Sequence, residues 1–490
     1  MPAFPQKFNS TVSHWQQTNR GPTSLWNHGR DAPLPTEVVD YVIIGAGATG
    51  ASLAYHLSRP GGAAEGKSIV IVDAKDVASC ASGRNGGHVP AQTWQMMTPF
   101  MAPLEEGGAG LTAEEVVDVI LFEQDNLALV ESIVQKERID ADFKKAPRFE
   151  VLINPESAAE NARLHRLFTS TVERMPKHRG RSLPVKIISN PAEAKKVSRV
   201  NNALAVNLTQ AGSWHPHRGV TALMRLALES KVSDVKFFSW TPVAGFTEQT
   251  DGTVSVDCGA RGTLTARNLI IGTSAYSHHL LPELENVLTG YRLQAGLVTP
   301  PATYAGAQAL KGTYAIEEGS YLIQTPTSGL VFGPYASVAN SRGLATPKEM
   351  YGVEDDSLTT APWRSWLSTY CPKTFGGWGP EVPGEGLTKV WSGIICHSVD
   401  HIPLVGPLPG RKGVFMAAGY SGQGMALIVN ITRGLAHQLK TCQWDDETMP
   451  RCFEITQARL ERAKRALQPR DYPVGGLSFT APTVNDEARL

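Results

Sequence analysis

The sequence predicts an α/β protein that combines a parallel sheet with an antiparallel one. Short, continuous apolar runs such as residues 68–72 suit buried parallel strands. An amphipathic helical pattern covers residues 113–137. Further along the chain, three segments alternate with turn residues and favour antiparallel strands, namely residues 291–300, 321–329 and 330–337.

Composition excludes several classes of protein. The 46 basic residues balance the 46 acidic ones, so no net field attracts nucleic acid. The six cysteines form no C-x-x-C pair, which argues against a disulfide scaffold or a structural zinc site and favours a reducing compartment. The N-terminus lacks the apolar core of a secretion signal, and no apolar stretch reaches the length of a membrane span.

The most informative segment is residues 40–50, which read DYVIIGAGATG. An apolar strand is followed by Gly45, Gly47 and Gly50 and then by a helical pattern. The first glycine permits a tight turn, the second lets the backbone approach a pyrophosphate, and the third lets helix and strand pack closely. A second strand ends at Asp73, whose carboxylate can accept both ribose hydroxyls of an adenosine. This series predicts a Rossmann-like dinucleotide site.

Three further motifs follow in order. A glycine-rich segment, CASGRNGGHV, covers residues 80–89. The next motif joins residues 241–246 to 265–277, and the last joins residues 391–407 to 417–429. With residues 40–73 these motifs resemble the D-amino-acid oxidase/glycine oxidase (DAO) superfamily of FAD flavoproteins. That superfamily includes sarcosine oxidase and γ-glutamylputrescine oxidoreductase.

The resemblance extends from Asp40 to Leu439 and implies a discontinuous, Rossmann-like FAD-binding domain with an inserted α+β substrate domain that carries the antiparallel sheet. Outside it lie a Pro- and Trp-rich arm and a C-terminal tail. We expect the arm at residues 1–36, FAD-binding segments at 37–98, 189–285 and 388–445, substrate-domain segments at 99–188 and 286–387, and a C-terminal helix and tail at 446–490.

The same resemblance implies which residues hold FAD. The expected set is Gly45, Gly47, Ala48, Thr49, Gly50, Asp73, Ala74, Ser82, Gly83, Arg84, Asn85, Gly86, Gly87, His88, Val243, Gly272, Thr273, Ser274, Gly393, Gly422, Gln423, Gly424 and Met425. We expect Arg84 and Asn85 to donate hydrogen bonds to cofactor oxygens. The helix that begins near Gly424 is expected to stabilise negative charge on the reduced flavin.

The chain departs from the family at three positions. Lysines that assist oxygen activation in some sarcosine oxidases are replaced by Val331 and Ala426. The arginine that grips a substrate carboxylate in related amino-acid oxidases is replaced by Ile395. The sequence therefore disfavours a free α-amino acid and favours a bulkier or less anionic amine.

Two histidines are candidates for the catalytic base, His397 and His88; for each, packing against backbone is the alternative interpretation. The expected substrate pocket comprises Tyr291, Arg292, Tyr321, Tyr335 and Ile395. The His215-Pro216-His217 segment resembles metal-ligand spacing, but a proline that begins a helix explains it, and we expect no metal.

The predicted function is FAD-dependent removal of a hydride from a C–N bond of an amine, with oxygen or another acceptor reoxidising the flavin. The alternatives are oxidation of a C–O or C–C bond in specialised metabolism, a flavin monooxygenase, for which we find no late G-D-A-x-H motif, and a non-catalytic flavin-binding protein.

We expect a small-molecule substrate, no nucleic acid or membrane partner, and a monomer or homodimer. The final tripeptide, Ala488 to Leu490, resembles the peroxisomal signal S-K-L, so cytoplasmic and peroxisomal locations both remain open.

Overall fold

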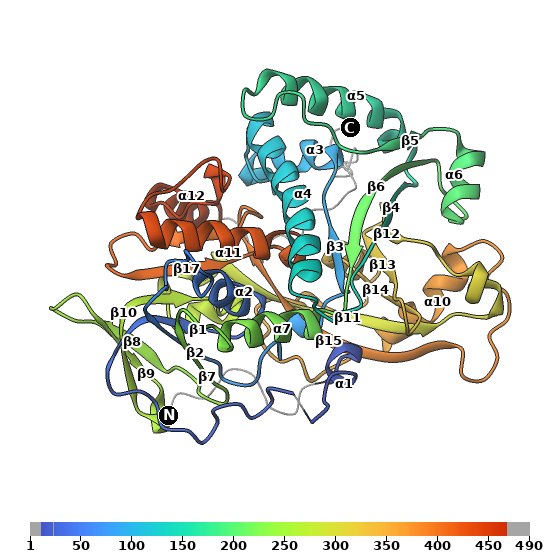
Figure 1. Ribbon diagram of the computed structural model, residues 1–490. Coiled ribbons are helices and arrows are strands. Elements are labelled where there is room, and N and C mark those ends of the chain that lie inside the picture. The colour runs from blue at the N-terminus through green and yellow to red at the C-terminus, as the bar shows by residue number, and fades with distance from the viewer. Residues whose placement is uncertain (1–10, 23, 468–490) are drawn as a thin grey trace.

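The computed structural model describes residues 11–22 and 24–467, and two sheets dominate it (Figure 1). The first is an eight-stranded sheet with a parallel centre. Its main path runs in the order β16 (Leu404–Pro407), β17 (Val414–Ala418), β10 (Thr263–Ile271), β1 (Val38–Ile44), β2 (Ser68–Val72) and β7 (Asp234–Phe238), with β8 (Gly245–Glu248) and β9 (Val254–Asp257) branching from β10.

Both faces of this first sheet are covered, which explains its continuous apolar strands. Ile43 and Ile71 belong to one hydrophobic cluster, and their neighbours Val42 and Val70 belong to another on the opposite face. The first cluster joins the sheet to the helices α2 (Ala48–Leu57), α7 (Pro216–Leu228) and α11 (Gly424–Thr441).

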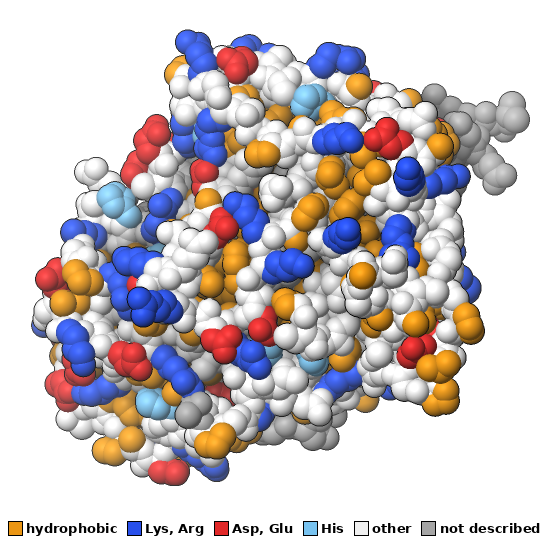
Figure 2. All heavy atoms as spheres, turned by 45° about the vertical axis from the view of Figure 1, so that its right-hand side comes forward, with side chains coloured by type: hydrophobic (Ala, Val, Ile, Leu, Met, Phe, Trp, Pro, Cys, Tyr) orange, Lys and Arg blue, Asp and Glu red, His pale blue; other side chains and the backbone are white. Residues whose placement is uncertain are grey.

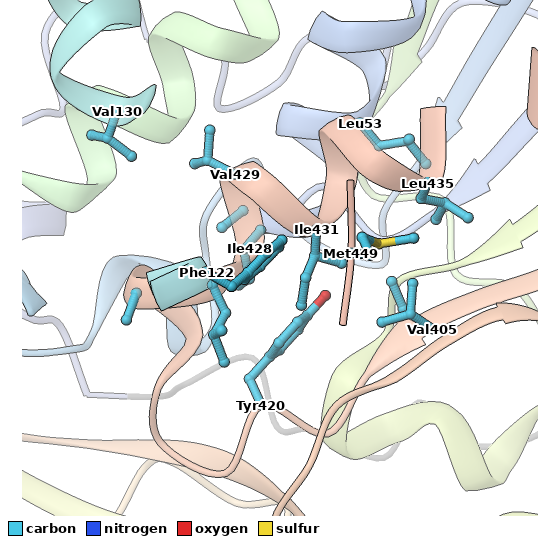
Figure 3. Packing of buried hydrophobic residues seen from close by; sticks show 14 of the residues in the cluster. Leu53, Phe122, Val130, Val405, Tyr420, Ile428, Val429, Ile431, Leu435 and Met449 are labelled. Carbon is cyan, nitrogen blue, oxygen red and sulfur yellow. The ribbon is translucent and has the colours of Figure 1, made fainter. Parts of the chain in front are cut away.

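The long helix α11 lies between α2 and α4 (Ala113–Lys136). Figure 3 shows its side chains Ile428 and Ile431 packed near Phe122 of α4 and near Tyr420, which precedes the helix. The hydroxyl of Tyr420 lies 2.9 Å from Thr49 Oγ1 of α2. The first turns of α2 and α11 are thus fixed relative to each other.

The second sheet has nine strands and is antiparallel except for the parallel pair of β12 and β4. Its path is β15 (Gly386–Ser398), β11 (Leu288–Thr299), β14 (Leu330–Pro334), β13 (Ser320–Gln324), β12 (Thr313–Ile316), β4 (Lys144–Leu152), β6 (Ala205–Ser213) and β3 (His88–Pro90), with β5 (Lys186–Ile188) beside β6. The predicted fold class is confirmed.

Most of the other helices lie around the second sheet, whereas the last one lies beside the first sheet (Figure 1). They are α3 (Met97–Met101), α5 (Pro155–Arg174), α6 (Pro191–Ser198), α8 (Ala336–Ser341), α9 (Pro347–Met350), α10 (Ala361–Thr374) and α12 (Gln457–Leu467). Helix α12 is held by a buried ion pair in which Arg459 Nε lies 2.7 Å from Asp400 Oδ2.

The described part of the N-terminal arm lies against the body of the protein. Its short helix α1 (His14–Gln17) carries the buried Trp15, and Trp26 contacts Trp240 edge to face with ring centroids 4.9 Å apart. The segment from Ser13 to Asn19 donates or accepts several hydrogen bonds with residues 79–87 and 215–217.

Basic and acidic side chains are interspersed over the face shown in Figure 2, in keeping with the balanced composition. Within the part of the chain that the structure describes, no helix combines the length and apolarity needed to cross a bilayer. The tripeptide Ala488 to Leu490 lies outside the described residues.

The domain boundaries stay predictions. Strand β6 lies in a range that we assigned to a FAD-binding segment, and β15 runs from a substrate-domain range into one, although both strands pair within the second sheet. The second sheet therefore draws on more of the chain than the two predicted insertions.

Candidate active site

One cavity is lined by residues that extend from the carboxyl end of β1 to strands β11, β13 and β15 of the second sheet. At its first end Gly45 has φ +105°, a left-handed conformation that favours glycine, and it leads into α2. Gly47 is the N-cap and has no side chain to accept from the helix, although Ser82 Oγ accepts from the backbone N–H of Ala48 at 2.8 Å. A helix N-terminus without a side-chain cap offers backbone N–H groups and a positive dipole end to an anion.

Asp73 holds this turn in shape. One oxygen accepts from the backbone N–H of Ala46 at 2.7 Å and the other from that of Lys75 at 2.8 Å. Burial raises the pKa of Asp73, while the two backbone donors act in the opposite direction. The residue lines the cavity, so its remaining lone pairs face the place where an adenosine ribose is expected.

The glycine-rich loop at residues 80–89 passes along the cavity, and its side chains bond mainly to protein. The amide of Asn85 donates to Ser82 O at 2.9 Å and accepts from Gly87 N at 2.7 Å. Arg84 Nε lies 3.1 Å from Asp356 Oδ2, and its Nη1 donates to Ser392 O. The guanidinium of Arg84 thus holds a buried ion pair while the residue lines the cavity; its donation to cofactor oxygens stays a prediction.

The other end of the cavity holds His397 and His88. Burial lowers the pKa of each imidazole to about 3, so both rings are neutral at neutral pH. His397 stacks on Tyr291 with ring centroids 4.3 Å apart. His397 Nδ1 and His88 Nε2 are buried and find no hydrogen-bond partner among the described residues. A ligand in the cavity could supply the missing partners.

Aromatic and aliphatic side chains form the wall around these histidines. Tyr321 of β13 and Tyr335, the N-cap of α8, line it with ring centroids 5.8 Å apart, and Ile395 lines it from β15. Met96 and Phe100 contribute from the α3 region. Burial raises the pKa of Tyr335 to about 12, so its phenol stays protonated.

Most of the predicted site residues therefore come together. From the cofactor set, the cavity is lined by Gly45, Gly47, Ala48, Thr49, Asp73, Ala74, Ser82, Arg84, Asn85, Gly86, His88, Val243, Gly272, Thr273, Ser274, Gly393, Gly422, Gln423, Gly424 and Met425. Their roles toward a cofactor stay predictions.

Three predicted cofactor glycines do not line the cavity. A Cβ at Gly50 would overlap the carbonyl oxygen of Gly45, so this glycine serves close packing of helix and strand. A Cβ at Gly83 would overlap the carbonyl oxygen of Ala78. Gly87 is turned toward the carbonyl of Trp214.

Two predicted pocket residues also lie outside the lining. Arg292 of β11 is absent from the cavity lining, although the three residues that follow it, Leu293, Gln294 and Ala295, contribute to it. Arg292 is buried and donates to the carbonyl of Asp355 at 3.2 Å. Tyr291 lies behind the ring of His397 and is covered by it.

The structure adds residues that the sequence interpretation missed, among them Gln92, Met96, Phe100, Leu293 and Tyr420. Met96 and Phe100 stand four positions apart, which is the spacing of one helix face, and that signal was available in the sequence. Gln92 had no such signal. Its backbone N–H donates to Glu123 of α4, and its Oε1 is buried with no partner among the described residues.

The histidines of the His215-Pro216-His217 segment have protein partners. His215 Nε2 lies 2.9 Å from Thr18 Oγ1, and His217 Nδ1 lies 2.8 Å from Asn19 Nδ2. His215 Nδ1 also accepts from the backbone N–H of Arg218 at the start of α7. These histidines connect the arm to α7.

The cavity fits a flavin dinucleotide in the chemistry of its lining. Glycines approach from both the β1 turn and the start of α11, which suits close backbone contact with phosphates and a ring. Gln423 Oε1, His397 Nδ1 and His88 Nε2 are buried acceptors or donors without partners among the described residues.

Comparison with known proteins agrees with this geometry. The family model described as "FAD dependent oxidoreductase" (DAO) matches residues 40–438. Gamma-glutamylputrescine oxidoreductase of Escherichia coli (strain K12) is 22% identical over 420 residues, which cover 81% of this chain and 84% of that protein. Human mitochondrial dimethylglycine dehydrogenase is 22% identical over 407 residues, covering 77% of this chain but only 40% of the longer relative.

Among solved structures, glycine oxidase from Geobacillus kaustophilus superposes with a TM-score of 0.65 at 20% identity, covering 86% of this chain and 99% of that one. At this identity the superposition shows the fold. The family match covers most of the chain and confirms the resemblance inferred from the motifs. The chain therefore belongs to the DAO family of FAD-dependent oxidoreductases and is an enzyme.

Proposed function

We propose that this enzyme removes a hydride from the C–N bond of an amine or amine-containing metabolite. The observation that carries the proposal is the set of backbone turns and side chains that line one cavity. A glycine turn and a helix N-terminus lie at its first end, and two neutral histidines with unpartnered ring nitrogens lie at the other among aromatic side chains. FAD supplies the hydride acceptor when bound.

Different residues of the chain would bind different parts of FAD. Gly45, Gly47 and Thr49 would hold the pyrophosphate, and Asp73 the adenosine ribose. The turn at Gly422 to Gly424, where α11 begins, would lie at the pyrimidine edge, because the helix dipole there favours developing negative charge.

Hydride removal requires an amine with a free lone pair, so the protonated amine must lose its proton. A largely apolar wall favours the neutral amine because desolvation disfavours a charged ammonium. His397 and His88 stay neutral at neutral pH and can accept a hydrogen bond from the substrate nitrogen. Their role is to orient the substrate more than to act as strong bases.

The scarcity of lysine and arginine side chains in the cavity lining limits the class of substrate that the site suits. Among the described residues that line the cavity, Arg84 is the sole lysine or arginine, and it is paired with Asp356. Ile395 lines the wall where related amino-acid oxidases are expected to carry an arginine. A substrate carboxylate thus has no guanidinium ready to bind it. The lining supports a bulky or weakly anionic amine over a free α-amino acid.

The test is anaerobic reduction of the purified yellow protein. A panel of secondary and tertiary amines, free amino acids, and matched alcohols would be added under nitrogen while flavin absorbance is recorded. Bleaching by amines but not by alcohols supports the proposal. Bleaching by alcohols alone would move the function to C–O oxidation, and reduction by NADPH alone would indicate a monooxygenase.

Two further measurements complete the assignment. Peroxide formed on readmission of air identifies oxygen as the acceptor, and its absence points to another acceptor. Acid precipitation of the protein shows whether the flavin is covalently attached, because a covalent flavin stays in the yellow pellet. A protein that remains colourless after incubation with excess FAD would contradict the proposal outright.

A further inference from the structure

A cluster of two histidines and a glutamate lies at the rim of the cavity. His278 and His279 end the short 3-10 helix Ser274–His279, which follows β10 of the first sheet. Their Nε2 atoms lie 3.0 and 2.6 Å from Oε1 of Glu354. The three ligand atoms, one from each residue, all lie within 4.8 Å of one another.

The orientation of His278 is set from outside the cluster. Its Nδ1 lies 3.1 Å from the carbonyl oxygen of Ala275, so Nδ1 carries the proton and donates. In the neutral ring Nε2 then presents a lone pair toward the carboxylate of Glu354. Two electron-rich atoms at 3.0 Å repel unless a cation lies between them. A backbone carbonyl that fixes the tautomer in this way is typical of metal-ligating histidines.

We propose that His278, His279 and Glu354 form a binding site for one divalent cation of the zinc class. Two imidazole nitrogens and one carboxylate oxygen are a ligand set that zinc accepts, with a fourth position left for water. The site has an entry path, since the side chain of His279 is 44% exposed and that of Glu354 is 18% exposed.

The proposed site joins two parts of the chain, so a bound cation would hold them together. Glu354 belongs to the segment after α9 and stands two residues before Asp356. Asp356 forms the ion pair with Arg84 of the glycine-rich loop. His279 lines the cavity beside Leu280. A bound cation therefore ties this segment to the cavity rim. Cation binding does not depend on the proposed amine reaction, so the two proposals can fail separately.

The experiment uses full-length, tag-free protein with its flavin, treated with a chelator and desalted. Zinc chloride is titrated in at neutral pH by calorimetry, and bound metal is measured after a second desalting step. We expect one equivalent to bind. Glu354→Gln and His279→Ala should each weaken binding by more than about tenfold. Zinc should raise the melting temperature of the wild type but not of these variants.

His437→Ala is the matched control. His437 Nε2 lies 3.6 Å from Asp445 Oδ2, its side chain is also 44% exposed, and it forms a two-residue pair. Its loss should leave the zinc affinity unchanged. Circular dichroism of the metal-free variants checks that they fold.

A proton is the competing occupant, because the carboxylate of Glu354 also raises the pKa of His278. If a proton suffices, zinc shows no saturable binding at one equivalent, and the proposal is wrong. The proposal also fails if binding persists unchanged in Glu354→Gln and His279→Ala, or if His437→Ala weakens it as much as they do.

Discussion

Gly86 of the glycine-rich loop lies directly against the ring of Tyr321 in β13, and a Cβ at position 86 would overlap Cε2 and Cδ2 of that ring. The contact joins the glycine-rich loop at residues 80–89, which is predicted to bind FAD, to the wall of the predicted substrate pocket. A residue with any side chain at position 86 would displace the loop or the tyrosine. The glycine is thus required by tertiary contact.

Gly86→Ala should therefore lower both stability and flavin content. Overpacking of this kind costs about 1–3 kcal/mol. Urea unfolding and the ratio of flavin to protein absorbance measure the two effects. Gly245→Ala is the control, since a Cβ there meets nothing within 4 Å. Equal behaviour of the two variants would contradict the contact.

The buried pair of Arg84 and Asp356 predicts a large stability effect. Their side chains are 2% and 1% exposed, and removing one partner leaves a buried charge uncompensated. Arg84→Ala should cost about 3–5 kcal/mol in the free energy of unfolding. Arg181→Ala, which breaks an exposed pair with Asp125, should cost less than about 1 kcal/mol. A loss at Arg84 no larger than at Arg181 would show that the pair does not matter.

Trp15 connects the N-terminal arm to the glycine-rich loop at residues 80–89. Its Nε1 donates a hydrogen bond of 2.7 Å to the carbonyl oxygen of Asn85. Trp15→Phe keeps most of the ring and removes the donor. We expect the free energy of FAD binding to become less favourable by about 1 kcal/mol, which corresponds to about fivefold weaker binding. Titration of the apoprotein with FAD measures it. Trp26→Phe, which alters the contact with Trp240, serves as the control and should bind FAD as the wild type does.

Glu123 predicts a dependence of stability on pH. Burial raises the pKa of this carboxyl from 4.5 to about 8 in the folded protein. Between these values the folded state holds a proton that the unfolded state has lost. The free energy of unfolding therefore falls as pH rises, with a slope approaching about 1.4 kcal/mol per pH unit from this group, and levels off above about pH 8.

Glu123→Gln should remove this slope and gain stability over the wild type as pH rises toward 8. Urea unfolding of both proteins across that range is the measurement. Glu131→Gln on the same helix alters an exposed pair with Lys145 and should leave the slope unchanged. Parallel stability curves for wild type and Glu123→Gln would refute the assignment.

The neutral state of His397 predicts the shape of the rate profile. With its pKa lowered to about 3, this ring does not titrate where free histidine does, near pH 6.5. The acid limb of kcat/KM should follow the pKa of each amine substrate instead. His397→Asn should reduce kcat/KM by about tenfold or more without shifting that limb. A limb fixed near pH 6.5 for every amine would show that a protein histidine is the base.

The first glycine motif illustrates how much could be read from the chain. Gly45 takes a positive φ in the predicted turn, and α2 begins at Ala48, three residues before the helical pattern that we expected after Gly50. Such a turn is decided by neighbours within about ten residues, so a short segment contains the information. The antiparallel strands of the second sheet were likewise visible as local patterns.

Arg84 and Arg292 show where that reading stopped. Both were expected at the site; Arg84 lines the cavity and Arg292 does not, and both guanidinium groups contact protein acceptors near Asp355 and Asp356. Those acceptors lie far away in sequence and reach the arginines only because of the way the sheets are assembled. No local pattern contains that information.

The sequence by itself determined the family, the α/β architecture and the backbone turns that face a dinucleotide, because each depends on conformational preferences of neighbouring residues. The tertiary structure alone decided which side chains face the cavity. Side-chain direction follows strand register, and register is set by packing between segments distant in sequence, as where Ser392 of β15 meets Arg84, 308 positions away.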